Sequence, residues 1–208
     1  MLKLRIVELG EIMKVRLLQK EERGLAGGLS RFVFDNYLRI RMEFPQTIGF
    51  VEEYLSLENL DRLCEEGKLL LWGAFEGEED EIFMGVSGMY TDGLITMLYI
   101  HPEFQKRRYG SELLFAMKQY AKEVLHLERV TLNATPAFTY SYFEKQGFFC
   151  KEEFCGVRVP FITMYAKTAD APIFHKRYVS GKTHALVIIG CFLMATLLGG
   201  GFFMGYFY

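Results

Sequence analysis

Apolar side chains recur along the chain with two spacings, one typical of strands and one typical of helices. Met13 to Leu18 is short and rich in apolar residues, which predicts a strand. A long helical pattern follows from about Glu21 to Glu66, and Phe44-Pro45 breaks it because proline disfavours helical backbone in the residue before it. We therefore expect two helices here, with a loop at Arg41 to Gln46.

Strands are predicted again in the middle of the chain, at Lys68 to Phe75, Glu81 to Tyr90 and Leu94 to His101. The segments between them have the composition of turns. One is the acidic stretch Gly77 to Asp80, and the other contains Asp92-Gly93, a pair typical of tight hairpins. This part of the chain is therefore predicted to fold as three consecutive strands.

Helix and strand patterns alternate after Gly110. Apolar residues first recur every three or four positions, which marks an amphipathic helix, and Val130 to Ala134 follows as a strand. Pro136 can open a second helix and Gly147 can close it. A final hairpin is expected from Phe148 to Phe154 and from Val157 to Lys167.

The end of the chain differs from the rest, because residues 185 to 208 carry no charged side chain. About 20 apolar residues suffice to span a bilayer as a helix, so we expect a transmembrane helix here rather than a buried core helix. Lys176, Arg177 and Lys182 precede this segment and no basic residue follows it. By the positive-inside rule, residues 1 to 167 should then lie in the cytoplasm.

The same segment contains small residues spaced four apart, Gly201 with Gly205 and Ala195 with Gly199. Such pairs let two membrane helices approach closely, so a helix-mediated dimer is possible. The alternative is that these glycines reflect the general tolerance of membrane helices for glycine. Residues 168 to 184 would form a basic linker between the soluble domain and the membrane.

Composition limits the partners and the compartment. The chain has 208 residues, 50% of them hydrophobic and 24% charged, which fits one globular domain with a buried core. A net charge of −2 gives no reason to expect nucleic acid as a partner. Cysteines at positions 64, 150, 155 and 191 follow neither a disulfide framework nor a zinc pattern, so we expect reduced thiols and no metal. Met1 to Gln19 lacks the apolar core of a secretory signal.

The stretch Leu98 to Leu114 combines a strand, a basic loop and the start of a helix. The first N–H groups of a helix are unpaired and lie at the positive end of its dipole, so they suit phosphate oxygens. Lys106, Arg107 and Arg108 add positive charge at this point. Spacing alone leaves two interpretations open, a phosphate site and a solvated basic loop.

Three blocks of sequence, MLYIHPEFQKRRYGSELL, LNATPAFTYSYFEKQGF and PFITMYAK, resemble successive signatures of the GNAT superfamily of N-acetyltransferases. The resemblance runs from about Ile12 to Lys167 and implies an α/β (α+β) fold with a mixed, mostly antiparallel central sheet flanked by helices. It also implies acetyl-CoA as co-substrate and an amine as acceptor. Residues 1 to 167 would form this domain.

The resemblance also implies where the cofactor binds. Gln105, Arg108 and Gly110 match the family's Q/R-x-x-G-x-G/A pattern, although Arg108 stands where the family usually has glycine. A side chain at that position disfavours a positive φ but adds a cation, so we expect altered rather than lost binding. The expected cofactor-binding residues are Leu98, Tyr99, Ile100, Gln105, Lys106, Arg107, Arg108, Tyr109, Gly110, Ser111, Asn133 and Phe143.

The catalytic acid and base are less clear in the sequence. The family often places a tyrosine acid four residues before the glycine of its E-K-x-G-F block, where this chain has Phe143. Tyr142 is the neighbouring candidate, although it points about 100° away on a helix. Glu43 is the candidate base or cation-binding residue, and Asp92 and His101 are alternatives, with solvated carboxylates and a structural histidine as the plainer interpretations.

Two functions follow from these residues, and a third follows from the basic loop alone. The first is a membrane-anchored N-acetyltransferase. The second is a sensor or interaction module that binds acyl-CoA without turnover, suggested by the substitutions at positions 108 and 143. The third is an unrelated adaptor whose basic loop meets anionic lipid. The family's acceptor site coincides with aromatic residues at positions 32, 34, 37, 44, 50 and 54, most of which also suit a core.

Overall fold

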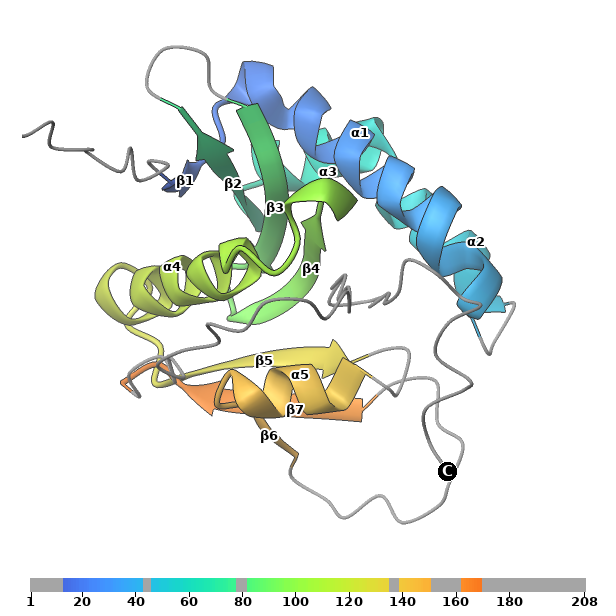
Figure 1. Ribbon diagram of the computed structural model, residues 1–208. Coiled ribbons are helices and arrows are strands. Elements are labelled where there is room, and N and C mark those ends of the chain that lie inside the picture. Colours follow the sequence, from blue (N-terminus) through green and yellow to red (C-terminus); the bar gives the residue numbers. More distant parts are fainter. Residues whose placement is uncertain (1–12, 43–45, 78–81, 135–138, 151–161, 170–208) are drawn as a thin grey trace, which may run out of the picture.

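A seven-stranded sheet forms the centre of the protein (Figure 1). The computed structural model describes residues 13–42, 46–77, 82–134, 139–150 and 162–169. The strands are β1 (Met13–Leu17), β2 (Leu69–Glu76), β3 (Ile82–Tyr90), β4 (Leu94–Ile100), β5 (Arg129–Ala134), β6 (Phe149–Cys150) and β7 (Ile162–Lys167). They lie in the order β1-β2-β3-β4-β5-β7-β6, and only the neighbours β4 and β5 are parallel. The predicted mixed, mostly antiparallel α+β fold is confirmed.

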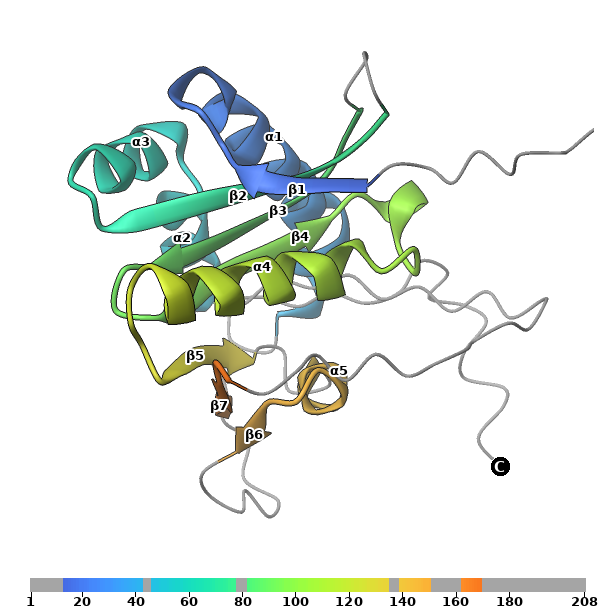
Figure 2. The same ribbon diagram turned by 90° about the vertical axis from the view of Figure 1, so that its left-hand side faces the viewer.

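Helices cover both faces of this sheet (Figure 2). They are α1 (Arg23–Val33), α2 (Gln46–Tyr54), α3 (Leu57–Glu65), α4 (Tyr109–Glu123) and α5 (Tyr140–Lys145), with short helical turns η1 (Lys20–Glu22), η2 (Phe34–Leu38), η3 (Arg39–Arg41) and η4 (Pro102–Phe104). Helices α1, α2 and α3 share one apolar core with the sheet, and α4 and α5 share the other. Since both faces are covered, the central strands are apolar on both sides.

Each predicted strand and helix has a counterpart among the described residues, with two differences in the first helical region. The second predicted helix is divided into α2 and α3 at Leu55-Ser56. Ser56 begins α3 as its N-cap, and its Oγ accepts a hydrogen bond from the N–H of Asn59 at 3.3 Å. The first predicted helix also ends in an unforeseen π-turn, η2, at Phe34–Leu38.

Several sequence-based expectations fall on residues outside the described ranges. These are Glu43, Phe44, Pro136, residues 151 to 161 of the last hairpin, and residues 170 to 208, which include most of the basic linker and the expected transmembrane segment. Among the residues that the structure does describe, no helix has the length and apolar character needed to cross a membrane. Cys64 and Cys150 are half-buried, and Cys155 and Cys191 lie outside the described ranges.

Candidate active site

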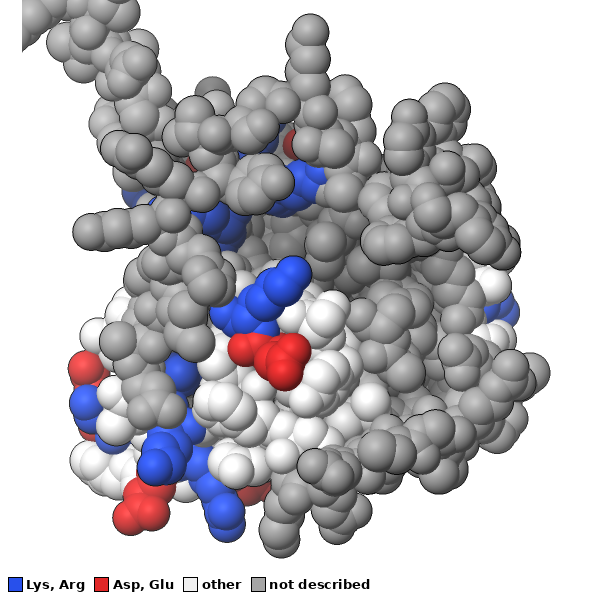
Figure 3. All heavy atoms as spheres, turned by 60° about the horizontal axis from the view of Figure 1, so that its bottom comes forward, with Lys and Arg blue, Asp and Glu red and all other residues white. Residues whose placement is uncertain are grey.

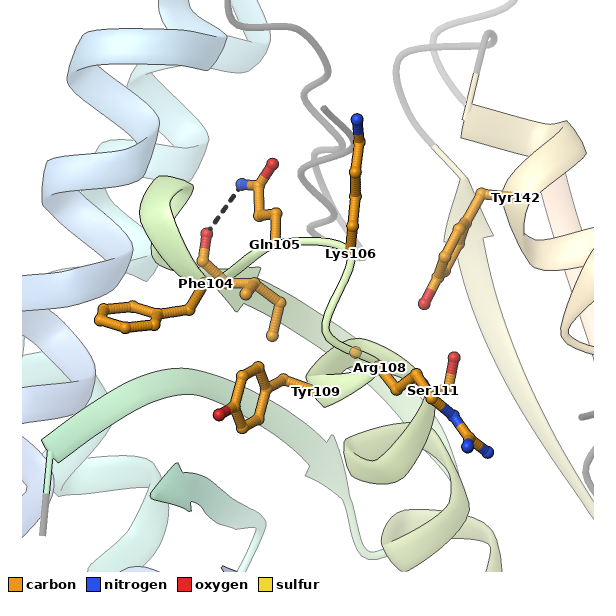
Figure 4. A pocket seen from close by; sticks show the side chains of 9 residues that line it. Phe104, Gln105, Lys106, Arg108, Tyr109, Ser111 and Tyr142 are labelled. Carbon is orange, nitrogen blue, oxygen red and sulfur yellow. Dashed lines mark hydrogen bonds between the residues drawn. The ribbon is translucent and has the colours of Figure 1, made fainter. Parts of the chain in front are cut away.

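A pocket lies between the end of β4 and the start of α4 (Figure 4). Its volume is about 230 Å³, less than the roughly 300–1,000 Å³ of sites that enclose a whole drug-sized ligand, so it suits one part of an extended molecule. It is lined by Ile100, Phe104, Gln105, Lys106, Arg108, Tyr109, Gly110, Ser111 and Tyr142. The structure thus gathers most of the loop that the sequence singled out and adds Phe104, which sequence reasoning missed.

Left-handed backbone shapes this loop. Lys106 has a φ of 65° and Arg108, the N-cap of α4, a φ of 72°. The side chain of Arg108 was expected to disfavour this conformation, and the chain adopts it nonetheless, at a cost of about 1–2 kcal/mol per non-glycine residue. Gly110 and Ser111, in the first turn of α4, line the pocket, and their N–H groups have no partner within the helix. The pocket therefore has the donors and the dipole that an anion requires.

Two buried side chains hold the loop in place. Gln105 is 7% exposed, and its Nε2 donates a hydrogen bond to the carbonyl oxygen of Ile100 at 3.0 Å (Figure 4). The hydroxyl of Tyr109, which is 2% exposed, donates to Oε1 of Glu76 on β2 at 3.0 Å. Both were expected to bind the cofactor. Their side-chain contacts show that they fix the backbone of the loop against the sheet.

Three cations surround this backbone. The guanidinium of Arg107 lies 5.4 Å from the centre of the Phe104 ring, and Arg107 is not among the residues that line the pocket. A guanidinium nitrogen of Arg108 lies 3.9 Å from Oε1 of Glu112. Partial burial lowers the pKa of the Lys106 ammonium, because removal from water disfavours its charged form. On the face that Figure 3 shows, the described basic and acidic side chains are interspersed.

Strands β4 and β5 are paired over only part of their length, and the unpaired part of β4 ends at Ile100, which lines the pocket. The two strands pair only at Leu94 with Thr131 and at Ile95 with Leu132, and beyond these pairs they diverge (Figure 1). Among the described residues, no strand pairs with β4 on that side from Thr96 to Ile100. An unpaired strand edge presents N–H and C=O groups that can accept a ligand as an added strand.

The peptide groups on this open edge can be assigned from the hydrogen-bond pattern. Leu98 and Tyr99 are fully buried, and Ile100 is 3% exposed and lines the pocket. The N–H of His101 donates to the carbonyl oxygen of Met84 on β3 at 2.8 Å, and alternate residues of an antiparallel strand face the same neighbour. The peptide groups of Tyr99 therefore face β3. Those of Leu98 and Ile100 face the gap.

Asn133 lies on β5, across the gap from β4. Its Oδ1 accepts a hydrogen bond from Oγ1 of Thr163 on β7 at 2.9 Å, so its side chain is oriented by the neighbouring strand. It is half-buried and belongs to the strand that diverges from β4. Its predicted contact with the cofactor stays a prediction.

Tyr142 and Phe143 point in different directions from α5. Phe143 is fully buried, and its ring packs against Phe148 with ring centres 5.6 Å apart, so it belongs to the core rather than to the pocket. Tyr142 lines the pocket and faces the loop (Figure 4). The turn of about 100° between successive helical residues explains both orientations. Of the two, Tyr142 has a hydroxyl that a ligand in the pocket can meet.

No carboxylate appears among the described residues that line the pocket. Oδ1 of Asp92 accepts a hydrogen bond from the N–H of Leu94 at 3.0 Å in the turn at the other end of β4. Nδ1 of His101 accepts from the N–H of Glu103 at 3.4 Å as the N-cap of η4, which supports its structural interpretation. Glu43 lies outside the described residues. Within the described ranges no group of three or more metal-binding side chains occurs.

The sheet gap and the anion-binding loop agree with one comparison of the sequence. A family model, the acetyltransferase (GNAT) domain, matches residues 43–168, more than half of the chain. The chain belongs to the GNAT acetyltransferase family. This GNAT enzyme is therefore an N-acetyltransferase, and acetyl-CoA is its co-substrate.

Solved structures share the fold of this GNAT enzyme. One is the PaiA N-acetyltransferase from Thermoplasma acidophilum in complex with coenzyme A, with 19% identity and a TM-score of 0.54, covering 75% of this chain and 99% of that chain. Another is the dodecameric spermidine N-acetyltransferase from Vibrio cholerae in an intermediate state, with 15% identity and a TM-score of 0.51, covering 75% and 94%. A search of curated proteins found no match. At these identities the likeness shows the fold alone.

Proposed function

We propose that the enzyme transfers the acetyl group of acetyl-CoA to a primary amine, from a cytoplasmic domain that a C-terminal helix tethers to a membrane. One observation carries the proposal for the site. The open edge of β4 runs directly into the basic loop and the first turn of α4. A single extended ligand can therefore place its phosphates at the loop and its thioester arm along β4.

Each part of the site then has a physical task. The N–H groups of Gly110 and Ser111 and the dipole of α4 bind phosphate oxygens, and Lys106 and Arg108 neutralise their charge. The peptide group of Leu98 pairs with the amide-containing arm. Acetyl-CoA supplies an activated acyl group as a thioester. The amine nitrogen bonds to the acyl carbon, the carbon–sulfur bond breaks, and a proton passes from the ammonium to solvent.

The departing thiolate needs a proton, and the hydroxyl of Tyr142 is the candidate donor among the residues lining the pocket. Tyr142→Phe tests this role. If the hydroxyl acts as the acid, kcat falls about tenfold or more while KM for acetyl-CoA stays constant. If KM rises and kcat does not change, Tyr142 binds the cofactor instead, and solvent reprotonates the thiolate.

The binding site itself is tested by calorimetric titration of coenzyme A, followed by thiol release with a panel of amines. The panel should include spermidine, because the similar solved structures include a spermidine N-acetyltransferase. Gly110→Pro removes one N–H group, and proline is tolerated in the first turn of a helix. Gly110→Ala keeps the N–H and is the matched control. Equal affinity in the two variants would contradict the assignment.

A second function is favoured by two observations. The position that commonly supplies the acid in the family is a buried phenylalanine, Phe143, and the described lining of the pocket has no carboxylate. Both facts suit a protein that binds acyl-CoA as a sensor. Binding of coenzyme A without thiol release, for every amine in the panel, would favour the sensor over the enzyme.

The membrane tether rests on the uncharged segment at 185 to 208 and on the preceding Lys176, Arg177 and Lys182. The full chain should remain in the membrane pellet after an alkaline carbonate wash. A chain that ends at residue 184 should appear in the supernatant. Protease added to sealed vesicles should digest the domain only when the cytoplasmic face is outward. Gly201→Ile should disrupt the helix-mediated dimer, if one forms, while leaving insertion intact.

A further inference from the structure

The divergence of β4 from β5 begins at a β-bulge. On the β3 side, Met97 lies opposite Gly88 and Ile95 lies opposite Met89, so Thr96 is an extra residue without a cross-strand partner. On the β5 side, the last paired residue of β4 is Ile95. The extra residue and the end of pairing therefore coincide. A bulge bends its strand and increases its twist. The bulge at Thr96 therefore accounts for the gap between β4 and β5 beyond Ile95, which we call the slot.

A buried hydrogen-bond chain is attached to this extra residue. Thr96 is 1% exposed and Tyr54, the last residue of α2, is 6% exposed. The hydroxyl of Tyr54 donates to Oγ1 of Thr96 at 2.6 Å, and Oγ1 of Thr96 donates to the carbonyl oxygen of Gly88 at 3.3 Å. The chain joins α2, the bulge and β3. It takes the hydroxyl of Thr96 away from β5 and toward the helix.

The position of Tyr54 is fixed from both ends. Nδ2 of Asn59, in the first turn of α3, donates to the carbonyl oxygen of Tyr54 at 3.0 Å. The ring packs edge-on against Tyr90, with ring centres 6.5 Å apart. Burial raises the pKa of the Tyr54 hydroxyl well above its usual value, so the hydroxyl keeps its proton and remains a donor at every physiological pH.

We propose that the hydrogen bond from Tyr54 to Thr96 holds the bulge in place and so keeps the β4–β5 slot open for the cofactor arm. Tyr54 is then a positioning residue, which acts on the cofactor through the strand that receives it. This inference rests on the proposed function insofar as the slot is the site of the arm. It assigns a role to a tyrosine that is not among the described residues lining the pocket.

The competing state can be described from the register. The parallel pairs Leu94–Thr131 and Ile95–Leu132 would continue, without a bulge, to Thr96–Asn133 and Met97–Ala134. Each added pair would satisfy strand edge groups that the open slot leaves to a ligand. The hydrogen bond from Tyr54 stabilises the bulged form of β4 relative to this fully paired form, and its loss would favour pairing with β5. The slot then spends more time closed, and the apparent affinity falls by the fraction that stays open.

Three variants of the full chain test whether the Tyr54–Thr96 hydrogen bond keeps the slot open. Tyr54→Phe and Thr96→Val each remove the hydrogen bond with almost no change in shape, and Thr96→Ser keeps the hydroxyl. Thr168→Val is the matched control, because Thr168 is 8% exposed and its Oγ1 donates to the carbonyl oxygen of Leu127 at 2.7 Å, far along the chain from the bulge. The measurements are calorimetric Kd for coenzyme A and amide hydrogen exchange of the peptide 96–100 without ligand.

We expect Kd to rise in Tyr54→Phe and Thr96→Val by up to about fivefold, the limit set by the roughly 1 kcal/mol of one buried hydrogen bond. Exchange in peptide 96–100 should slow, because the closed slot protects it. Thr96→Ser and Thr168→Val should keep the wild-type Kd. An unchanged Kd in both hydroxyl-deleting variants overturns the proposal, as does faster exchange, which would mean general loosening. If the wild type does not bind coenzyme A, the proposed function is wrong. The exchange measurement, made without ligand, would still test whether the Tyr54–Thr96 hydrogen bond keeps the slot open.

Discussion

Substitutions at Arg108 can separate two effects at one position. One is the stability lost to left-handed backbone, and the other is the affinity for coenzyme A gained from the positive charge. The residue has a φ of 72° and caps α4, and its guanidinium is beside the pocket. Arg108→Gly removes both the strain and the cation. Arg108→Ala removes the cation and keeps the strain. The two variants should therefore lose the same affinity for coenzyme A and differ in stability.

The expected magnitudes follow from the conformation and the exposure. Left-handed backbone costs an L-residue about 1–2 kcal/mol, which glycine avoids. Glycine also loses more conformational entropy on folding, and this offsets roughly 0.5–1 kcal/mol of that gain. Arg108→Gly should thus be more stable than Arg108→Ala by about 0.5–1 kcal/mol, a difference of about 1–4 °C in Tm for a chain of this size. The side chain of Arg108 is 62% exposed, so its contact with a phosphate is screened and its loss should raise Kd about fivefold at most.

The assay is thermal unfolding without ligand and calorimetric titration with coenzyme A, for both variants and for Arg107→Gly. Arg107 is the matched control, because it carries the same charge next in sequence and is absent from the described residues with a positive φ. Glycine there should lower the stability of the fold. If Arg108→Gly melts below Arg108→Ala, or if Arg107→Gly is stabilised equally, the reasoning from backbone strain is wrong.

Three further predictions concern other parts of the domain. Phe143→Tyr places a hydroxyl in the core and should destabilise by about 1–3 kcal/mol without raising kcat; recovered activity would show that the position still reaches the thioester. Glu112→Gln removes the carboxylate 3.9 Å from Arg108 and should tighten coenzyme A about threefold at low salt, and an unchanged Kd would contradict competition for that cation. The hydrogen bond from Arg16 lowers the pKa of Glu22 below 4.5 against the opposing effect of burial, so its stabilisation is present above that pH and lost as pH falls through the folded pKa. Denaturant unfolding between about pH 5 and pH 3 should therefore show a flatter decline in Glu22→Gln than in the wild type.

The strands were predictable because each is short, apolar and bounded by residues with strong turn preferences. Asp92-Gly93 is an example, since β3 and β4 end and begin within two residues of it. The division of α2 from α3 was also visible in principle. Ser56 is a good N-cap in the middle of the helical pattern, and giving more weight to that signal would have located the break. The π-turn η2 has no comparable local signal, because it depends on how α1 packs against the sheet.

At the site, the sequence located the loop, but it did not distinguish side chains that face a ligand from side chains that hold the loop. Gln105 and Tyr109 satisfy both descriptions until their partners, Ile100 and Glu76, are known. These partners are 5 and 33 residues away in the chain, and only the fold brings the second of them near. Phe104 was missed because an aromatic residue before the loop has no distinguishing pattern.

The bulge at Thr96 could not be predicted from the sequence of β4 alone. In sequence, Leu94 to Ile100 is a uniform apolar strand, and nothing in it indicates an extra residue. The bulge is stabilised by a hydroxyl 42 residues earlier in the chain, on a helix of the opposite layer. A slot within a sheet costs paired hydrogen bonds, so some contact outside the strand has to favour the open form. On this reasoning, the affinity for the cofactor depends partly on contacts on the face of the sheet that α2 covers. A change in the position of α2 would alter the hydrogen bond to Thr96 and, through β4, the binding of the cofactor arm.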